Sequence, residues 1–237
     1  MLLDKYPIFQ QAYLVNDLEE SAKKWNKIFG AGPFVFSPHH KCDTFEYRGT
    51  PQEADVSYAF GYVGDMMIQF IQQHDETPSI YRDMYKNGEE GYHHIGVLVS
   101  DFDKELDKLM SHGFELACRL YADGVDAAYV DTREFNGVFT ELHGDPNHIL
   151  GEFARWKRAH DISKPGDDIH LKRVKIVDFK DDEKFIKCSF EYQKDILSKE
   201  DDLLPLSLTA IKRLEKLTSV NKKISSETIN NIKQLKD

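Results

Sequence analysis

Two stretches of the chain repeat the same pattern of apolar and polar positions. FQQAYLVNDLEESAKKWNKIFG (residues 9–30) aligns with HHIGVLVSDFDKELDKLMSHGF (residues 93–114), so that residue 9 matches residue 93 at a constant offset of 84. Each copy opens with a short run rich in Val, Ile, Leu or Tyr, which is typical of a strand. The apolar positions then recur every three or four residues, as on a helix with one buried face. The pattern predicts a strand and a helix, twice.

An aspartate stands at the change of period in each copy. Asp17 and Asp101 occupy the position before the first helical residue, where an Asp side chain can accept a hydrogen bond from a free helix N–H group. Glu20 lies three residues after Asp17, which is the spacing of a capping box. We therefore expect both helices to begin directly after these aspartates.

Further strand-like runs, separated by turn residues, follow each predicted helix. In the first copy they are PFVFS, residues 44–48, DVSYAFGYV and MMIQFIQQ, and in the second FELACRLYA, DAAYVDT and GVFTELHG. Each copy is therefore predicted to be a βαβββ module, with modules at about 6–77 and 91–150 that together form a domain over residues 6–150. Residues 31–52 mix loop and strand signals and fit the pattern least well.

The pattern changes after about residue 152. FARWKRAHDI (153–162) predicts a short helix, and SKPGDD (163–168) has the Pro, Gly and charge content of a linker. The remaining chain, 165–237, is predicted to be a C-terminal α/β extension of unknown role. Two strands are expected in it at LKRVKIVDF and KFIKCSFEY, and two helices at LSLTAIKRLEKL and SETINNIKQLK. An interaction or oligomerisation element is one hypothesis for this extension.

Composition narrows the partners and the compartment. The 237 residues carry 31 Lys and Arg against 41 Asp and Glu, a formal charge of −10, which disfavours binding to nucleic acid. We expect no membrane partner, because no apolar run approaches the roughly 18 residues that a span needs. The start MLLDKYPIF lacks a secretory signal pattern, so a cytoplasmic protein is expected. Cys42, Cys118 and Cys188 fit neither a disulfide framework nor a zinc site.

The tandem modules, each entered by a strand that leads into Asp, resemble the vicinal oxygen chelate superfamily. This superfamily includes glyoxalase I, methylmalonyl-CoA epimerase, extradiol dioxygenases and bleomycin-resistance proteins. The resemblance covers about residues 6–150. It implies an α+β fold in which the paired modules form a curved mixed sheet around a cleft, and it implies a small-molecule substrate. A homodimer is compatible with it.

The resemblance also implies a metal site. In the family a divalent ion is held by one residue from the first strand and one from the last strand of each module. Carried over to this chain, those positions are Gln10, Gln69, His94 and Glu141. One imidazole, one carboxylate and two amide oxygens suit Mg, Mn, Co, Ni or Zn. The leading hypothesis is a metal-dependent isomerase, epimerase or lyase that acts on a small carbonyl or thioester through a metal-chelated enolate or enediolate.

A base is needed for such chemistry. The resemblance implies two candidates: Glu141, as a ligand carboxylate that also accepts the proton, and Glu53, which lies in a polar turn upstream of the last strand of the first module.

Gln10 departs from many family members, which have histidine at this position. The two-histidine, one-carboxylate set that Fe(II) dioxygenases need is therefore incomplete. The alternative hypothesis is a metal-free ligand-binding protein of the same fold, similar to bleomycin-resistance proteins. The aromatic content of the first module is compatible with that alternative.

Two adjacent histidines begin the second copy. Neighbouring side chains on a regular strand point to opposite faces, so only one of them is expected at the site. His94 matches Gln10 in the repeat and is the predicted ligand. His93 is predicted to lie on the other face, in packing or at the surface.

Overall fold

The computed structural model describes residues 2–171. Residues 2–146 and 159–171 belong to one compact unit, and residues 147–158 belong to a second. The predictions for residues 172–237, which include both strands and both helices of the C-terminal extension, lie outside the described residues. In residues 2–171, no helix is both long and apolar enough to cross a membrane.

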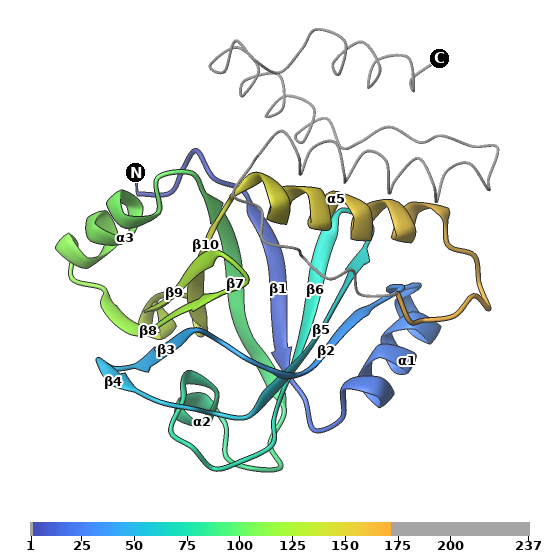
Figure 1. The fold of residues 1–237 in the computed structure, drawn as a ribbon, viewed down its shortest axis with the longest axis horizontal. Coiled ribbons are helices and arrows are strands. Elements are labelled where there is room, and N and C mark those ends of the chain that lie inside the picture. Colours follow the sequence, from blue (N-terminus) through green and yellow to red (C-terminus); the bar gives the residue numbers. More distant parts are fainter. Residues whose placement is uncertain (1, 172–237) are drawn as a thin grey trace, which may run out of the picture. The chain divides into compact units, whose positions relative to one another are not determined.

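Within the described residues, ten strands form one mixed, curled sheet (Figure 1). Their order is β2-β5-β6-β1-β7-β10-β9-β8-β3-β4. The strands are β1 (Ile8–Leu14), β2 (Val35–His40), β3 (Thr44–Tyr47), β4 (Thr50–Pro51), β5 (Val56–Val63), β6 (Met66–Gln73), β7 (Gly91–Val99), β8 (Glu115–Ala122), β9 (Val125–Asp131) and β10 (Phe139–Gly144). The α+β class and the curved mixed sheet of paired modules are confirmed.

The two modules meet where β1 pairs with β7 in the antiparallel direction. Gln11 pairs with Ile95, and on either side Gln10 pairs with Gly96 and Ala12 with His94. The offset of 84 carries residue 10 to 94, 11 to 95 and 12 to 96, so the pairing maps each module onto the other. Outward from this seam, β6, β5 and β2 on one side match β10, β9 and β8 on the other. The repeat in the sequence is therefore a local twofold relation in the sheet.

The predicted helix of each module packs on the outer face of the curled sheet. α1 (Leu18–Phe29) packs through Leu18 and Ala22, and α3 (Phe102–Ser111) packs through Leu106 and Leu109. These apolar positions are the stripe that the sequence pattern predicted.

The two aspartates at the helix starts differ in what they do. The Asp17 carboxylate accepts a hydrogen bond from the Glu20 N–H at 2.9 Å, as an N-cap should. The Glu20 side chain forms an ion pair with Lys24, so the reciprocal half of the predicted capping box is not seen. α3 begins after Asp101 as predicted, but the Asp101 side chain makes no capping bond.

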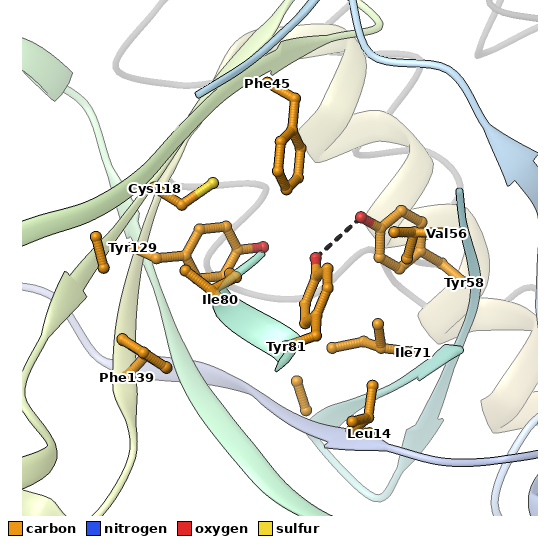
Figure 2. Packing of buried hydrophobic residues seen from close by; sticks show 12 residues of the cluster. Leu14, Phe45, Val56, Tyr58, Ile71, Ile80, Tyr81, Cys118, Tyr129 and Phe139 are labelled. Atoms are coloured by element: carbon orange, nitrogen blue, oxygen red, sulfur yellow. Dashed lines mark hydrogen bonds between the residues drawn. The ribbon is translucent and has the colours of Figure 1, made fainter. Parts of the chain in front are cut away.

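The inner face of the curled sheet carries a second core, which we call the inner cluster. Strands of both modules contribute to it, together with β3 and the short helix α2 (Ile80–Met84) (Figure 2). Its buried members are Ala12, Leu14, Phe45, Val56, Tyr58, Ile71, Ile80, Tyr81, Ala117, Cys118, Tyr129 and Phe139. The predicted cleft side of the sheet is thus largely packed with side chains of the chain itself.

The sequence predicted β3, as the strand-like run at residues 44–48, but it did not predict β4, α2 or α4 (Arg133–Asn136). α2 connects β6 to β7, and α4 connects β9 to β10. The β3–β4 hairpin belongs to the first module by sequence, yet β3 pairs with β8 of the second module, with Phe45 opposite Leu120. It therefore extends the second half of the sheet and covers part of the inner face.

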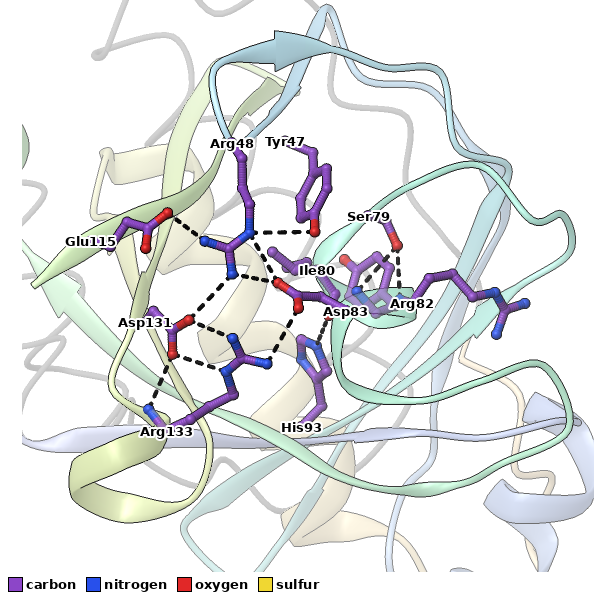
Figure 3. Close-up of polar contacts among 11 residues, drawn as sticks. Tyr47, Arg48, Ser79, Ile80, Arg82, Asp83, His93, Glu115, Asp131 and Arg133 are labelled. Carbon is purple, nitrogen blue, oxygen red and sulfur yellow. Dashed lines mark hydrogen bonds and ion pairs between the residues drawn. The ribbon is translucent and has the colours of Figure 1, made fainter.

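A network of ion pairs fastens the hairpin and α2 to the second module (Figure 3). Arg48, at the hairpin turn, pairs with Asp83 of α2 at 2.6 Å and with Asp131 of β9 at 3.3 Å, and it also pairs with Glu115 of β8. Arg133 pairs with Asp131 at 2.6 Å and with Asp83 at 3.4 Å. Two arginines and three carboxylates thus join elements that lie far apart in the sequence.

The last described elements are α5 (Asn147–Ile162) and the segment after it. α5 includes the predicted helix at 153–162 and begins earlier. After it, Leu171 donates to the Phe34 carbonyl at 2.7 Å, and Phe34 donates to the Ile169 carbonyl at 2.6 Å. The residues directly after the predicted linker are therefore hydrogen-bonded to the first module. Cys42 and Cys118 are free thiols, and Cys188 lies outside the described residues.

Candidate functional site

The four predicted ligand positions lie on four neighbouring strands and share the inner face. Gln69 is on β6, Gln10 on β1, His94 on β7 and Glu141 on β10. Their exposed fractions are 4%, 2%, 0% and 4% respectively. All four predicted positions are therefore nearly excluded from solvent.

The strand register explains why these side chains can approach one another. Ala12 lies between Gln69 and His94 in one cross-strand row, and Gly96 lies between Gln10 and Glu141 in the next. Diagonal neighbours in a sheet are about 7–8 Å apart, which long side chains can span. Because the intervening residues are Ala and Gly, the longer polar side chains have room above them.

Gly96 has a specific steric role in this arrangement. A Cβ atom at this position would lie 2.9 Å from Gln10 Oε1 and 2.9 Å from a ring carbon of Phe9. Those distances are shorter than normal contacts allow. The missing side chain of Gly96 is what makes room for the Gln10 amide.

Each of the four residues presents one buried side-chain atom that has no hydrogen-bond partner within residues 2–171. These atoms are Gln10 Oε1, Gln69 Oε1, His94 Nε2 and Glu141 Oε2. Leaving such atoms unpaired costs free energy in a folded protein. They are the atoms that the predicted metal site requires as ligands.

His94 and Glu141 are the pair that the structure brings closest. His94 Nε2 lies 3.5 Å from Glu141 Oε2. The other carboxylate oxygen, Oε1, accepts a hydrogen bond from the Tyr129 hydroxyl at 2.9 Å. Tyr129 pairs directly with Glu141 between β9 and β10. One oxygen of Glu141 is thus held by the sheet and the other faces His94.

Electrostatics keep Glu141 and Tyr129 in defined protonation states. Burial by itself raises the pKa of Glu141, but the nearby His94, followed by His143 and the Tyr129 hydroxyl, lowers it below its usual value. The pKa of Tyr129 lies well above its usual value because of burial and the nearby Glu141 charge. At neutral pH Glu141 is therefore ionised and Tyr129 remains a hydrogen-bond donor.

The prediction for His93 was wrong about its face. Ala12 pairs with His94 and Tyr13 pairs with Tyr92, so His93 is an extra residue in the ladder. Such a bulge breaks the alternation of side chains. His93 is fully buried, and its Nδ1 lies 2.9 Å from His94 Nδ1. Both histidines therefore reach the same region.

The pKa of His93 is well below its usual value, first because of burial and then because of the neighbouring His94. His93 is therefore neutral at physiological pH. The first module has a matching irregularity, because β1 has a register shift at Phe9 and residue 9 matches residue 93 in the repeat. This match becomes visible only once the strand pairing is known.

Glu53 lies apart from these residues. It is exposed in the segment between β4 and β5. In residues 2–171, no hydrogen bond or ion pair of the structure joins it to any of the four positions. Its predicted role as a base stays a prediction.

Solved structures with a similar fold are distant in sequence. A methylmalonyl-CoA epimerase from Mycobacterium tuberculosis is 18% identical, with a TM-score of 0.41, over 59% of this chain and 87% of its own. A hypothetical protein from Bacillus halodurans C-125 is 18% identical, with a TM-score of 0.43, over 60% of this chain and 95% of its own. A Streptomyces coelicolor methylmalonyl-CoA epimerase variant in complex with 2-nitronate-propionyl-CoA is 19% identical, with a TM-score of 0.38, over 58% and 96%. Likenesses of this size carry no inference about activity.

Comparison with curated protein sequences gave no match. A family model does match, over residues 9–129, which is half of the chain and covers both copies of the repeat. Its description is the superfamily that the tandem modules were predicted to resemble. The chain belongs to the Glyoxalase/Bleomycin resistance protein/Dioxygenase superfamily.

Proposed function

We propose that this protein is a divalent-metal-dependent isomerase, epimerase or lyase that removes an α-proton from a small carbonyl or thioester substrate. The observation that carries the proposal is the set of four buried polar atoms on adjacent strands, none with a hydrogen-bond partner among the described residues. One bound cation can interact favourably with several buried oxygen and nitrogen atoms at once, which offsets the cost of burying them.

The residues fit a divalent ion of the Mg, Mn, Co, Ni or Zn class. In residues 2–171, no group of three or more His, Cys, Asp or Glu side chains is placed to hold a metal. A metal here would therefore depend on the amide oxygens of Gln10 and Gln69 as well as on His94 and Glu141. When bound, a divalent ion supplies Lewis-acid polarisation of a substrate carbonyl oxygen.

Glu141 is the better placed of the two candidate bases. Its Oε2 faces the proposed site, its Oε1 is held by Tyr129, and its lowered pKa keeps it ionised. A carboxylate in this state can take a proton from the α-carbon of a substrate that is held within hydrogen-bonding reach. Tyr129 limits the rotation of the carboxylate while this happens.

The inner cluster supplies the surroundings of this reaction. Phe139 and Tyr129 lie beside the site residues in the sheet register, and both are buried. Apolar neighbours exclude water, which strengthens the electrostatic interactions inside the site. They also limit the size of a substrate, and its entry requires side chains of the inner cluster to move apart.

A metal-free ligand-binding function is the alternative. The aromatic side chains of the inner cluster favour it, since they could contact an apolar ligand. A second observation in its favour is that Gln10 Nε2 donates to the sulfur of Met67 at 3.2 Å, so this amide belongs partly to packing.

The test begins with metal binding. Purified, metal-stripped protein would be titrated with Mn²⁺, Co²⁺, Ni²⁺ and Zn²⁺ by isothermal titration calorimetry. We expect micromolar or tighter binding of at least one ion and a large loss in Gln10→Ala. Gln11→Ala is the matched control, because Gln11 is the next residue on β1 and is not one of the four inner-face ligand positions. Absence of binding by all four ions would overturn the metal-dependent proposal.

Reaction chemistry is tested separately. The metal-loaded protein would be incubated in deuterated water with acyl-CoA thioesters and with hemithioacetals, and α-proton exchange followed by NMR. Exchange in one class, lost in Glu141→Gln, is expected. Metal binding without exchange in either class would leave the metal site standing and remove the proposed reaction.

A further inference from the structure

His93 occupies a buried position between α2 and the predicted ligand His94. Its ring packs between Tyr81 and Phe139, with ring centroids 5.0 and 5.3 Å away. Its Nε2 lies 3.2 Å from the Ile80 carbonyl oxygen and its Nδ1 lies 2.9 Å from His94 Nδ1 (Figure 3 shows the first of these contacts). Both ring nitrogens of His93 are therefore engaged.

These contacts determine where the protons are. A carbonyl oxygen only accepts, so His93 Nε2 must carry a hydrogen and donate it to Ile80. A neutral imidazole has one donor and one acceptor nitrogen, and a charged ring buried among aromatic side chains would be costly. His93 Nδ1 is therefore an acceptor. The hydrogen between the two rings belongs to His94 Nδ1.

We propose that His93 is a positioning residue: it accepts the Nδ1–H of His94 and so leaves the lone pair of His94 on Nε2, the atom that faces Glu141. This inference rests on the proposed metal site, because only a ligand needs that lone pair at that atom. The hydrogen bond from the non-ligating nitrogen of a histidine fixes its tautomer and ring orientation. Here the bulge at His93 brings the acceptor into reach.

The matching position in the first module explains why His94 needs an acceptor beside it and Gln10 does not. Phe9 corresponds to His93 in the repeat, and Gln10 corresponds to His94. An amide presents its oxygen without any choice of tautomer, whereas an imidazole must be set to one. Phe9, whose ring has no hydrogen-bond acceptor, can therefore stand beside Gln10 without affecting how the amide presents its oxygen.

Two substitutions separate a positioning role from a packing role. In His93→Asn, the side-chain oxygen is attached to Cγ, as Nδ1 is in histidine, so the acceptor is kept while the ring is lost. In His93→Phe, the ring is kept and the acceptor is lost. If His93 only fills space, His93→Phe should be the milder change, because deleting part of a buried ring leaves a cavity. A positioning role predicts the reverse order for metal affinity.

The first measurement is the Zn²⁺ affinity of wild type and both variants by calorimetry, with circular dichroism to confirm folding. We expect His93→Phe to bind about 10–100-fold more weakly than wild type, and His93→Asn to fall between the two. Equal affinity in His93→Phe and wild type, or a weaker His93→Asn than His93→Phe, would overturn the proposal.

The second measurement does not need a metal. Two-bond ¹H–¹⁵N spectra of the metal-free protein with ¹⁵N-labelled histidine, at a pH where His94 is neutral, report its tautomer. The proposal requires Nδ1–H in wild type and loss of that single tautomer in His93→Phe. An Nε2–H tautomer of His94 in wild type would overturn it. This result is independent of whether wild type binds Zn²⁺, so it is distinguishable from failure of the proposed function.

Discussion

Gly96 and Ala12 are small residues on the inner face, and each lies between two of the longer polar residues in the sheet register. They are related by the repeat offset of 84, and each faces the predicted ligand position of the other module across the β1–β7 seam. A larger side chain at either place would fill the space that the polar groups use. Ala12 and Gly96 thus contribute to the proposed site by leaving space, without being ligands themselves.

Gly96→Ala tests this at the scale of one residue. The new methyl group would meet the Gln10 amide at 2.9 Å, so Gln10 must rotate or the strands must separate. We expect a loss of roughly 1–3 kcal/mol in the free energy of unfolding and at least tenfold weaker metal binding. Urea denaturation and calorimetry measure the two effects. Wild-type metal affinity in this variant would show that Gln10 is not part of the site.

At the scale of elements, the β3–β4 hairpin and α2 depend on charge for their placement. α2 has five residues and β4 has two, too few for strong packing by themselves. Their side chains Phe45, Ile80 and Tyr81 nevertheless form much of the inner cluster, and the Ile80 carbonyl holds His93. The ion pairs of Arg48 and Arg133 therefore support the site from a distance.

Asp131→Asn should weaken this support in a pH-dependent way. Hydrogen bonds from Arg133 hold the pKa of Asp131 below its usual value. Its contribution to stability is therefore present above the unfolded-state pKa of about 4 and is lost as the pH falls through the folded-state pKa. We expect a destabilisation of about 1–2 kcal/mol at pH 7 that shrinks below about pH 4.

Chemical denaturation of wild type and variant at several pH values measures this difference. Asp126→Asn is the control, since Asp126 lies on the same strand and pairs with the more exposed Arg119. A change there is expected to stay below about 0.5 kcal/mol. A difference for Asp131→Asn that is the same at pH 3 and pH 7 would contradict the assigned role.

At the scale of the whole molecule, neither module has a complete core. The inner cluster draws Tyr58 from the first module and Tyr129 from the second, and β3 of the first module is paired with β8 of the second. The central strands β1 and β7 would each become an unprotected edge if the modules were separated.

Splitting the chain tests this dependence. Fragments 1–86 and 87–237 would be produced separately and mixed, the cut lying in the exposed segment 86–90 between α2 and β7. We expect neither fragment alone to unfold cooperatively in urea and the mixture to recover the far-UV circular dichroism of the intact chain. Cooperative unfolding of either fragment by itself would show that a module is an independent domain.

The sequence predicted the tandem modules and both outer helices, because hydrophobic periodicity is a local property of the chain. It also predicted that Gln10, Gln69 and Glu141 occupy matching strand positions, because the second module repeats the pattern of the first. The pairing of β3 with β8 was not predicted, since the pattern within one strand does not specify which other strand lies beside it. The ion pairs of Arg48 with Asp83 and Asp131 were not predicted either, because these residues lie far apart in the sequence.

His93 and His94 illustrate the difference between what the sequence predicts and what the fold adds. That one of them matches Gln10 follows from counting residues in the repeat. That both reach the same face could not be read from the sequence, because a bulge depends on how β1 pairs with β7 and not on the residues of one strand. The fold also places the Ile80 carbonyl, thirteen residues before His93, within 3.2 Å of His93 Nε2, a contact that no pattern in the sequence indicates.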